Sequence, residues 1–240
     1  PTMLNILMTV DRKGKGADYL KSIKSTFCIG TAPLFPQLKK EFEARYGVEL
    51  LQSYGLSETL FISTKVNDKD TDKDSVGTLL KEVHLEFSEN QEIWLDVPWM
   101  FLGYSNEKTE DYFEGQFYMS GDLGKLEEDH LYITGRKKDL IVRGGMNISP
   151  KQIEEKLLES GLVKESAVSS VVEKCEEIII CWYVPAEIIE NPGVVLNGLL
   201  MDKLGKAYKV DKFICVKEIP KNLNGKVDKE RLKREYQHDC

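Results

Sequence analysis

The chain lacks the excess of basic residues that nucleic-acid-binding proteins usually carry. Its 240 residues include 33 Lys and Arg against 40 Asp and Glu, which gives a formal net charge of −7 and a pI of about 5.2. Binding to phosphate backbones depends on clustered Lys and Arg side chains. The charge balance therefore argues against a nucleic acid as the main partner.

Long apolar segments are also absent. The longest uninterrupted run extends from Ile178 to Val184, whereas a membrane-spanning helix needs roughly 20 residues. We therefore expect no transmembrane segment. The first residues carry neither the basic flank nor the small-residue cleavage site of a signal peptide. Because the sequence starts at Pro1, we expect a processed product or an excised fragment.

Cysteine and histidine are scarce and irregularly spaced. The five cysteines form an odd-numbered set without a Cys-x-x-Cys pair, which argues against a disulfide framework and against a zinc site. A reducing, cytoplasmic location is the simplest expectation. The three histidines have no spacing typical of a metal site or a catalytic triad, so we assign them no role.

The composition nevertheless indicates a folded chain. Hydrophobic residues make up 41% of the sequence and charged residues 30%, near the values of globular proteins and without long blocks of one sign. By its length, the chain fits one large domain or two of modest size.

The first part of the sequence predicts a β-α-β unit. Residues 27–31 predict a strand, residues 33–46 a helix with apolar side chains at helical spacing, and residues 48–52 a second strand. The segments that follow the two strands, Gly30–Pro33 and Tyr54–Glu58, then lie where ligands bind in open α/β sheets.

Two further regions follow. Residues 77–132 predict a β-rich subdomain of short strands and turns, with separate strands at 117–120 and 124–126. After residue 139 the pattern mixes strands with helices, one of which starts at Ser149-Pro150, and predicts a small α+β domain of about a hundred residues. The expected fold class is therefore α/β and α+β.

Five short segments carry the candidate chemistry, in order from near the start of the chain to near its end. They are Gly30-Thr-Ala-Pro-Leu34, Gln52-Ser-Tyr-Gly-Leu-Ser-Glu58, Tyr118-Met-Ser-Gly-Asp-Leu-Gly124, Gly135-Arg-Lys-Lys-Asp-Leu-Ile141 with Gly144-Gly145, and Pro220-Lys-Asn-Leu-Asn-Gly-Lys226. This ordered set resembles the successive motifs of the adenylate-forming superfamily, which includes acyl-CoA synthetases, peptide-synthetase adenylation domains and luciferases. Among these, the chain is most similar to the carboxyl-terminal part of an acyl-CoA synthetase, of the kind that acts on long-chain fatty acids.

The resemblance implies a reaction in two steps. A carboxylate attacks the α-phosphate of ATP to give acyl-AMP and pyrophosphate, and the thiol of CoA then displaces AMP. Both steps build negative charge, which preorganised cations and hydrogen-bond donors stabilise. The implied small-molecule partners are a carboxylic acid, ATP or AMP, Mg²⁺ and CoA. Among carboxylic acids we expect a fatty acid.

By resemblance, the first region holds the nucleotide and the metal. Tyr54 offers a face for adenine, Ser57 a hydroxyl for a phosphate oxygen, Glu58 a carboxylate ligand for Mg²⁺, and Asp122 an acceptor for two ribose hydroxyls. A lone tyrosine at a strand end is more often a core residue, and an Asp in a Ser-Gly-Asp loop is often only a turn residue. The flanking motifs favour the ligand roles, which also extend to Gly30, Thr31, Ala32 and Gly55.

The second region carries the residues that change place between the steps. Lys226, in a glycine-containing turn, resembles the lysine that stabilises charge during adenylation. Lys138 matches the hinge of the family, about which the small domain rotates. After the rotation Gly144-Gly145 would give room for the pantetheine arm, and Arg136 would reach the ribose and phosphate. The alternatives are that Arg136 and Lys226 are ordinary solvated surface residues and that Gly144-Gly145 is only a turn after a strand.

The hinge divides the chain into residues 1–137, the end of the AMP-binding domain, and residues 138–240, the small C-terminal domain. The Gly/Ser/Thr-rich phosphate loop of the family is nowhere in these residues, so the β- and γ-phosphates lose their backbone cradle. We therefore expect the chain to need the missing N-terminal part of its own enzyme and to be inactive alone. The alternatives are a non-catalytic nucleotide-binding or interaction module, and an adenylation enzyme that serves a carrier protein or makes an aryl-CoA.

Overall fold

The structure is a computed structural model that describes residues 2–11, 14–23, 26–30, 36–65, 75–173, 176–222 and 225–238. The chain divides into two compact units, Pro1–Ile133 and Thr134–Cys240. The predicted boundary after residue 137 lies a few residues later than this division. The division between the units falls inside strand β9 (His130–Arg136), and the predicted boundary falls in the short 3-10 turn η2 (Lys137–Asp139) that follows it.

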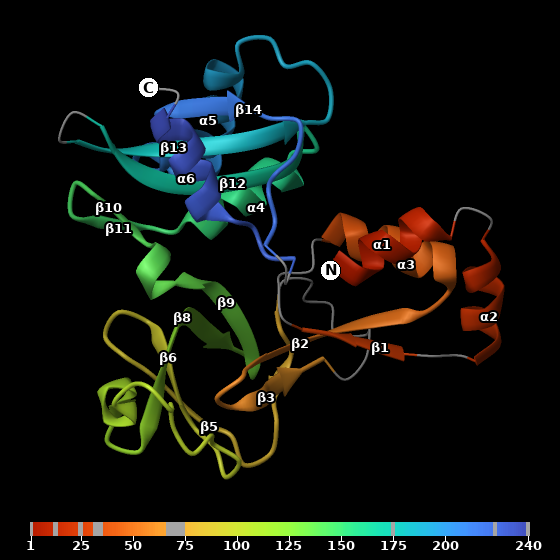
Figure 1. Ribbon diagram of the computed structural model, residues 1–240, viewed down its shortest axis with the longest axis vertical. Helices are drawn as coiled ribbons and strands as arrows, with labels where there is room; N and C mark the ends of the chain where they lie inside the picture. Colours follow the sequence, from red (N-terminus) through yellow and green to blue (C-terminus); the bar gives the residue numbers. More distant parts are fainter. Residues whose placement is uncertain are drawn as a thin grey trace. The chain divides into compact units, whose positions relative to one another are not determined.

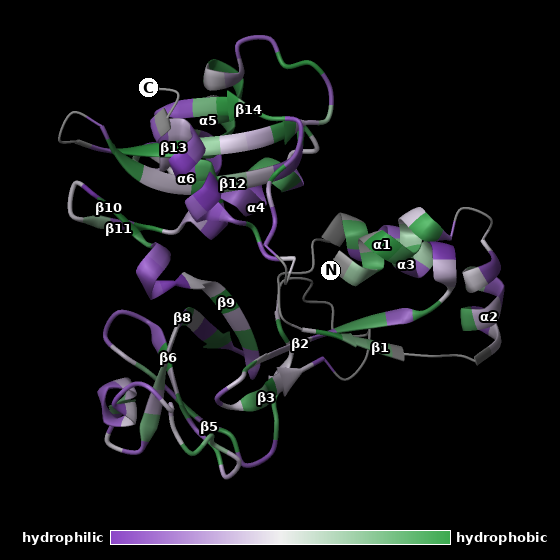
Figure 2. Cartoon of the chain, viewed as in Figure 1, coloured by the Kyte–Doolittle hydropathy of each residue, from purple (hydrophilic) through white to green (hydrophobic). Residues whose placement is uncertain are grey.

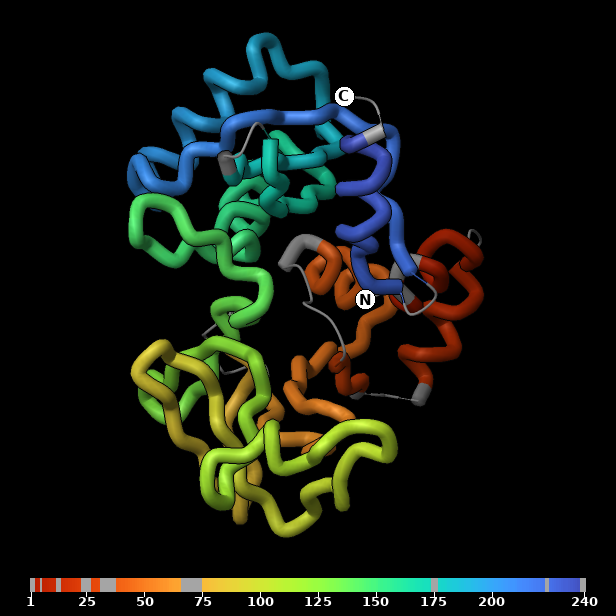
Figure 3. Tube along the Cα trace, turned by 60° about the vertical axis from the view of Figure 1, so that its left-hand side comes forward, coloured from red at the N-terminus to blue at the C-terminus, as the bar shows by residue number. Residues whose placement is uncertain are grey.

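The first unit opens with two helices that the sequence analysis did not predict, α1 (Thr2–Val10) and α2 (Lys15–Ile23). They lead into β1 (Thr26–Ile29), α3 (Pro36–Tyr46) and β2 (Glu49–Leu56). The strands β1 and β2 pair in parallel, which confirms the predicted β-α-β unit. Figure 3 follows the chain from α3 directly into β2.

Helical spacing on α3 produces the core of this β-α-β unit. Phe42 and Tyr46 lie four residues apart and therefore on one face, where both are fully buried and their ring centroids are 4.4 Å apart. Leu50 on β2 and Leu4 on α1 pack against them. The side chain of Arg45 donates to carbonyl oxygens at the end of α1, which fixes α1 on α3.

A single mixed sheet contains every strand of the first unit. Its order is β1-β2-β3-β4-β9-β8-β6-β5, with β7 paired to β8. The predicted β-rich region is therefore a continuation of the β-α-β sheet. The remaining strands and the 3-10 turn η1 have the following bounds: β3 Leu60–Thr64, β4 Thr78–Leu79, β5 His84–Phe87, β6 Glu92–Asp96, η1 Thr109–Tyr112, β7 Phe113–Glu114 and β8 Phe117–Glu127.

Two sequence predictions about this sheet were wrong. The strands expected at 117–120 and 124–126 are one continuous strand, β8, because both halves pair with β6 on either side of a register shift. The strand expected at 48–52 runs on to Leu56. Tyr54 and Gly55 consequently lie inside β2, and the turn begins only at Ser57.

The second unit is a three-stranded sheet covered on both faces (Figure 1). Helices α4 and α5 pack on one face and α6 on the other. A separate hairpin, β10 with β11, precedes them. The bounds are β10 Ile141–Arg143, β11 Met146–Ile148, α4 Pro150–Glu159, β12 Val163–Glu173, β13 Glu176–Pro185, α5 Pro192–Leu204, η3 Lys206–Tyr208, β14 Lys212–Cys215 and α6 Lys229–His238.

The alternation of β13 explains this arrangement. Ile179 and Cys181 point to the core that α4 and α5 cover, whereas Ile180 and Trp182 point to the face covered by α6. Helix α4 begins at Pro150, as the Ser149-Pro150 pair predicted. No helix in the described part of the chain has both the length and the apolar character that crossing a membrane requires.

Candidate nucleotide site

A hydrogen bond joins two of the motif residues in the first unit. The Tyr54 hydroxyl, on β2, donates to Asp122 Oδ2, on β8, over 2.8 Å. Asp122 is only 4% exposed. A buried carboxylate needs such donors, because removing its charge from water without them is costly. The structure thus brings together the predicted adenine and ribose residues from two distant motifs.

This contact also shows how strongly the sheet curves. In the strand order, β3, β4 and β9 separate β2 from β8. In a flat sheet these four strand spacings would hold the two strands roughly 19 Å apart, much farther than a tyrosine side chain reaches. The sheet must therefore curve strongly, and the buried residues Ile62, Ile93 and Leu131 pack in its core.

The backbone around Asp122 is held by neighbouring side chains. The Ser120 hydroxyl donates to the Ile93 carbonyl (2.7 Å) and accepts from the Asp122 amide (3.1 Å). The Gly121 amide donates to Glu92 Oε1 over 3.1 Å. These bonds replace the strand ladder at the register shift between β6 and β8. Asp122 is therefore a fixed acceptor within β8, and the turn expected at this position is absent.

Gly55 sets the close approach of β2 and β3. The register shifts between Tyr54 and Gly55, and a Cβ on Gly55 would lie 1.9 Å from the carbonyl oxygen of Leu60. Only glycine permits backbones to come this close. The approach leads into the tight turn that carries Ser57 and Glu58, of which Ser57 is exposed and Glu58 half-buried.

A second tyrosine contacts the Glu58 carboxylate. The Tyr104 hydroxyl donates to Glu58 Oε1 over 2.7 Å and lies 3.0 Å from the hydroxyl of Tyr118. Burial, assisted by the hydrogen bonds to Tyr118 and Glu58, raises the pKa of Tyr104 well above its ordinary value. The phenol is therefore a neutral donor at physiological pH.

The segment from Trp99 to Tyr104 supports the same turn through the backbone. The Trp99 indole N–H donates to the Thr59 carbonyl (2.7 Å), and the Phe101 amide donates to the Glu58 carbonyl (2.8 Å). The Phe101 ring meets the rings of Tyr104 and Tyr118 edge to face, at centroid distances of 4.9 and 5.5 Å. None of these contacts with Glu58 was predicted from the sequence.

The predicted residues after β1 are only partly described. Gly30 directly follows the strand, and a Cβ there would lie 3.4 Å from Ser53 Oγ. Thr31 and Ala32 lie outside the described residues. Their assignment to the nucleotide stays a prediction.

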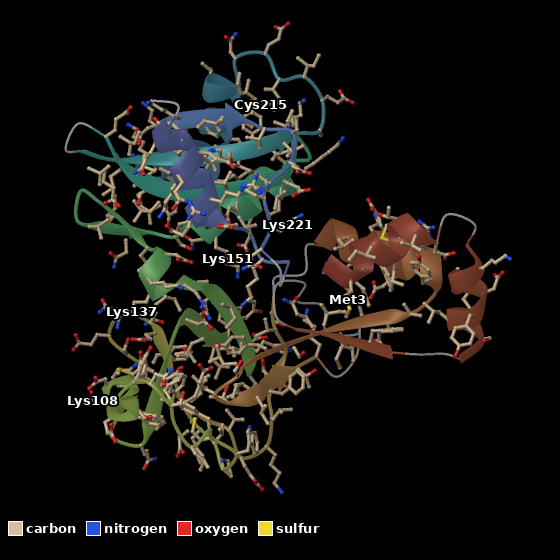
Figure 4. All side chains as sticks on the ribbon, in the orientation of Figure 1. Met3, Lys108, Lys137, Lys151, Cys215 and Lys221 are labelled. Carbon is tan, nitrogen blue, oxygen red and sulfur yellow. The ribbon has the colours of Figure 1, made fainter. Side chains whose placement is uncertain are left out.

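The other predicted residues belong to the second unit. Arg136 ends β9, and the exposed Lys138 lies in the turn η2 next to Lys137, which is labelled in Figure 4. Gly144 and Gly145 form the exposed tip of the β10–β11 hairpin with φ values of 57° and 79°. Positive φ at both tip positions is typical of a two-residue hairpin turn.

Lys226 lies in a turn that its own backbone closes. Its amide donates to Asn222 Oδ1 (3.0 Å), and its carbonyl accepts from the Asn222 amide (2.8 Å). A bridge between Lys221 and Val227 brackets the turn; Lys221 is labelled in Figure 4. The side chain of Lys226 is exposed, and its role in adenylation stays a prediction.

The carboxylate available here fits a magnesium ion that is held mainly by the phosphates of a bound nucleotide. Among the described residues no group of three or more His, Cys, Asp and Glu side chains could form a metal cage. Mg²⁺ in nucleotide sites commonly takes only one or two protein carboxylates, together with waters and phosphate oxygens. Glu58, half-buried on a fixed turn, can be such a carboxylate.

Comparisons with known proteins agree with this geometry. The family described as AMP-binding enzyme matches residues 1–105. The chain belongs to the adenylate-forming superfamily. A 2-succinylbenzoate–CoA ligase of Lactococcus lactis is 31% identical over 82% of this chain and 44% of its own length. A Staphylococcus aureus relative named for long-chain fatty acid–CoA ligation is 26% identical over 98% of this chain and 50% of its own length.

Solved structures of the adenylate-forming superfamily share the fold. The ATP-bound MatB of Rhodopseudomonas palustris is 30% identical and aligns with a TM-score of 0.78 over 88% of this chain and 45% of that one. The amide bond synthetase McbA of Marinactinospora thermotolerans is 26% identical, with a TM-score of 0.78 over 87% and 46%. The chain spans about half the length of the curated relatives that it matches.

Proposed function

We propose that this chain supplies the nucleotide-binding carboxylates and the mobile lysine of an AMP-forming acyl-CoA ligase. The observation that carries the proposal is the hydrogen bond between Tyr54 and Asp122 (2.8 Å), which unites two adenylate-forming motifs at a buried carboxylate. The names of the relatives support the same class of enzyme. In this proposal the activity belongs to a protein that also contains the other half of the relatives' length.

In the proposed reaction the site residues hold the nucleotide and stabilise the negative charge that develops on it. Asp122 accepts hydrogen bonds from the ribose hydroxyls, and Tyr54 keeps its carboxylate in place. A substrate carboxylate oxygen then bonds to the α-phosphorus of ATP, and the bond from that phosphorus to pyrophosphate breaks. Lys226 stabilises the charge that develops there. Mg²⁺, held by Glu58, would neutralise phosphate charge when bound.

The second half-reaction uses the second unit differently. The CoA sulfur bonds to the acyl carbon, the bond to AMP breaks, and the thiol proton passes to solvent. We propose that rotation about Lys138 removes Lys226 and brings in the Gly144–Gly145 tip, while Arg136 stays near the ribose. The exposure of Lys138 supports this role, because a hinge must change its φ and ψ without breaking a packed core.

We propose a fatty acid as the substrate and CoA as the acceptor. The relative named for fatty acid ligation aligns with nearly the whole chain, and several relatives are named for CoA ligation. The amide bond synthetase among the solved structures makes an amine the competing acceptor. Product analysis with CoA and with amines distinguishes the two.

The test measures ATP affinity of the chain by titration calorimetry in the absence of divalent metal. Asp122→Ala removes an acceptor, and each hydrogen bond to a charged group is worth about 1.5–3 kcal/mol. We therefore expect the dissociation constant to rise roughly 10- to 150-fold for one lost bond. Asp111→Ala, an exposed aspartate of the same unit, is the matched control and should bind like the unchanged chain.

The catalytic arm uses the longer protein and ATP–pyrophosphate exchange over a panel of acids. Exchange that depends on Asp122 supports the ligase. ATP binding without exchange for any acid would instead indicate a nucleotide-binding module. Equal ATP affinity of the Asp122→Ala and Asp111→Ala variants would refute the site itself.

A further inference from the structure

One described side-chain hydrogen bond holds the Glu58 carboxylate, and it comes from a residue that no motif includes. Tyr104 lies 46 positions after Glu58 in the sequence, and its hydroxyl donates to Glu58 Oε1 over 2.7 Å. Glu58 sits at the tip of a turn, where a glutamate side chain would otherwise sample many rotamers. Ordering such a side chain costs up to about 2 kcal/mol of conformational free energy. A ligand carboxylate that is already ordered does not incur this cost when the metal binds.

The direction of the hydrogen bonds is fixed by what each group can donate. An ionised carboxylate only accepts, so the single hydroxyl hydrogen of Tyr104 is directed to Glu58. The oxygen of Tyr104 can then only accept from Tyr118, whose hydroxyl lies 3.0 Å away and which is 4% exposed. The resulting series of hydrogen bonds runs from Tyr118 to Tyr104 to Glu58, and hydrogen bonds linked in this way strengthen one another.

Backbone contacts hold both Tyr104 and Glu58 in place. Tyr104 is fixed by its amide, which donates to Thr109 Oγ1 over 2.9 Å, and by its ring contact with Phe101. Glu58 is fixed by the Phe101 amide at its carbonyl. Oε1 is thus occupied, and none of the described residues donates a hydrogen bond to Oε2. Oε2 of Glu58 can therefore still bind a metal ion, and the hydrogen bond at Oε1 fixes the direction in which it points.

From these contacts we propose that Tyr104 is a positioning residue, which orients the Glu58 carboxylate as a ligand for the magnesium ion of the bound nucleotide. The inference rests on the proposed function and adds a residue to that site. Hydrogen bonds of this type, made to a metal ligand by a neighbouring side chain, are commonly worth 10- to 100-fold in metal affinity.

The experiment compares two phenylalanine variants. Tyr104→Phe removes the hydroxyl that contacts Glu58. Tyr112→Phe is the matched control: its ring meets the Tyr104 ring at 4.8 Å, and its hydroxyl also donates to a carboxylate, that of Glu107. Both variants lose one phenol hydroxyl in the same aromatic cluster, but only one of these contacts Glu58.

The first readout does not depend on turnover. Mn²⁺ is titrated into the chain with saturating ATP, and the free ion is followed by its electron paramagnetic resonance signal. We expect Tyr104→Phe to weaken Mn²⁺ retention roughly 10- to 100-fold, with unchanged ATP affinity in EDTA. Tyr112→Phe should change neither value. In the longer protein the Mg²⁺ concentration for half-maximal pyrophosphate exchange should rise by a similar factor, with the rate at saturating Mg²⁺ preserved.

A double-mutant cycle separates positioning from a loss of structure. In a Glu58→Gln background, Tyr104→Phe should have no further effect on Mn²⁺ retention, because the two changes interrupt one interaction. Additive effects, or equal losses with Tyr112→Phe, would overturn the inference. Unchanged Mn²⁺ retention in Tyr104→Phe would do the same while the nucleotide site stands. If the longer protein binds no ATP, the proposed function fails, and this inference fails with it.

Discussion

Helix α6 provides a quantitative test of how the second unit holds the Lys226 turn. The helix starts three residues after Lys226 and is mostly hydrophilic, as the purple ribbon in Figure 2 shows. Leu232 and Tyr236 pack the helix on the sheet. Lys229 adds a polar anchor: its Nζ donates to Glu154 Oε1 (2.9 Å) on α4 and to the Val168 carbonyl (2.8 Å) on β12. The perturbation is Lys229→Met, which keeps the apolar stem and removes the charge.

The magnitude follows from the partners that are left behind. Glu154 Oε1 also accepts from the Val168 amide over 2.7 Å, so the carboxylate would keep one donor. A hydrogen bond between charged groups is worth about 1.5–3 kcal/mol. The Lys229 and Glu154 side chains are 25% and 20% exposed, and solvent screening favours the lower part of that range. We expect a loss of about 1.5–2 kcal/mol, or roughly 10- to 30-fold in the opening equilibrium of α6.

Hydrogen exchange measured by mass spectrometry is the direct assay. Amides of α6 should lose roughly 10- to 30-fold protection in Lys229→Met. The control is Lys233→Met on the same helix, where a 3.5 Å pair with the largely exposed Glu230 is worth only about 0.2–0.5 kcal/mol. It should change protection by at most about twofold. Equal effects of the two substitutions would refute the argument that the half-buried Lys229–Glu154 contact fixes the helix.

Three further predictions concern packing and burial. Gly55→Ala should destabilise the first unit by about 3 kcal/mol or more in urea unfolding, since its Cβ would meet Leu60 backbone at 1.9 Å; Gly198→Ala in α5, with nothing within 4 Å of its Cβ, should stabilise by about 0.5–1 kcal/mol. Burial raises the pKa of the Cys181 thiol, so a disulfide reagent at pH 8 should modify the exposed Cys28 and Cys215 and reach Cys181 only after unfolding, as peptide mapping can show. Early labelling of Cys181 would contradict its burial.

Local patterns allowed much of the fold to be predicted. The β-α-β unit followed from apolar spacing along 33–46, because a helix repeats its face every three to four residues. The start of α4 followed from Ser149-Pro150, and the mixture of strands and helices after residue 139 followed from the change in pattern there. These features depend on neighbours in the sequence, which a sequence displays directly.

Features set by distant partners could not be predicted in this way. Gly121-Asp122 has the composition of a turn, but pairing with β6 extends β8 through it. Tyr104 has no local signal for its role, because its partner Glu58 lies 46 positions away. The only indication was the run of aromatic residues from 99 to 104, which is equally typical of core packing. Motif matching proposed Tyr54, Glu58 and Asp122, and the structure supplied the hydrogen bonds that hold the two carboxylates.

Those groups are phenols at both carboxylates, and this choice has a consequence for binding. Tyr54 donates to Asp122 and Tyr104 donates to Glu58. A lysine or arginine in either place would orient the carboxylate equally well, but its positive charge would cancel much of the attraction for a cation and compete for the same oxygen. A neutral phenol fixes the direction of the carboxylate and leaves its charge in place. For Glu58 that charge is what a magnesium ion would require, and for Asp122 it strengthens each bond that a ribose hydroxyl would donate.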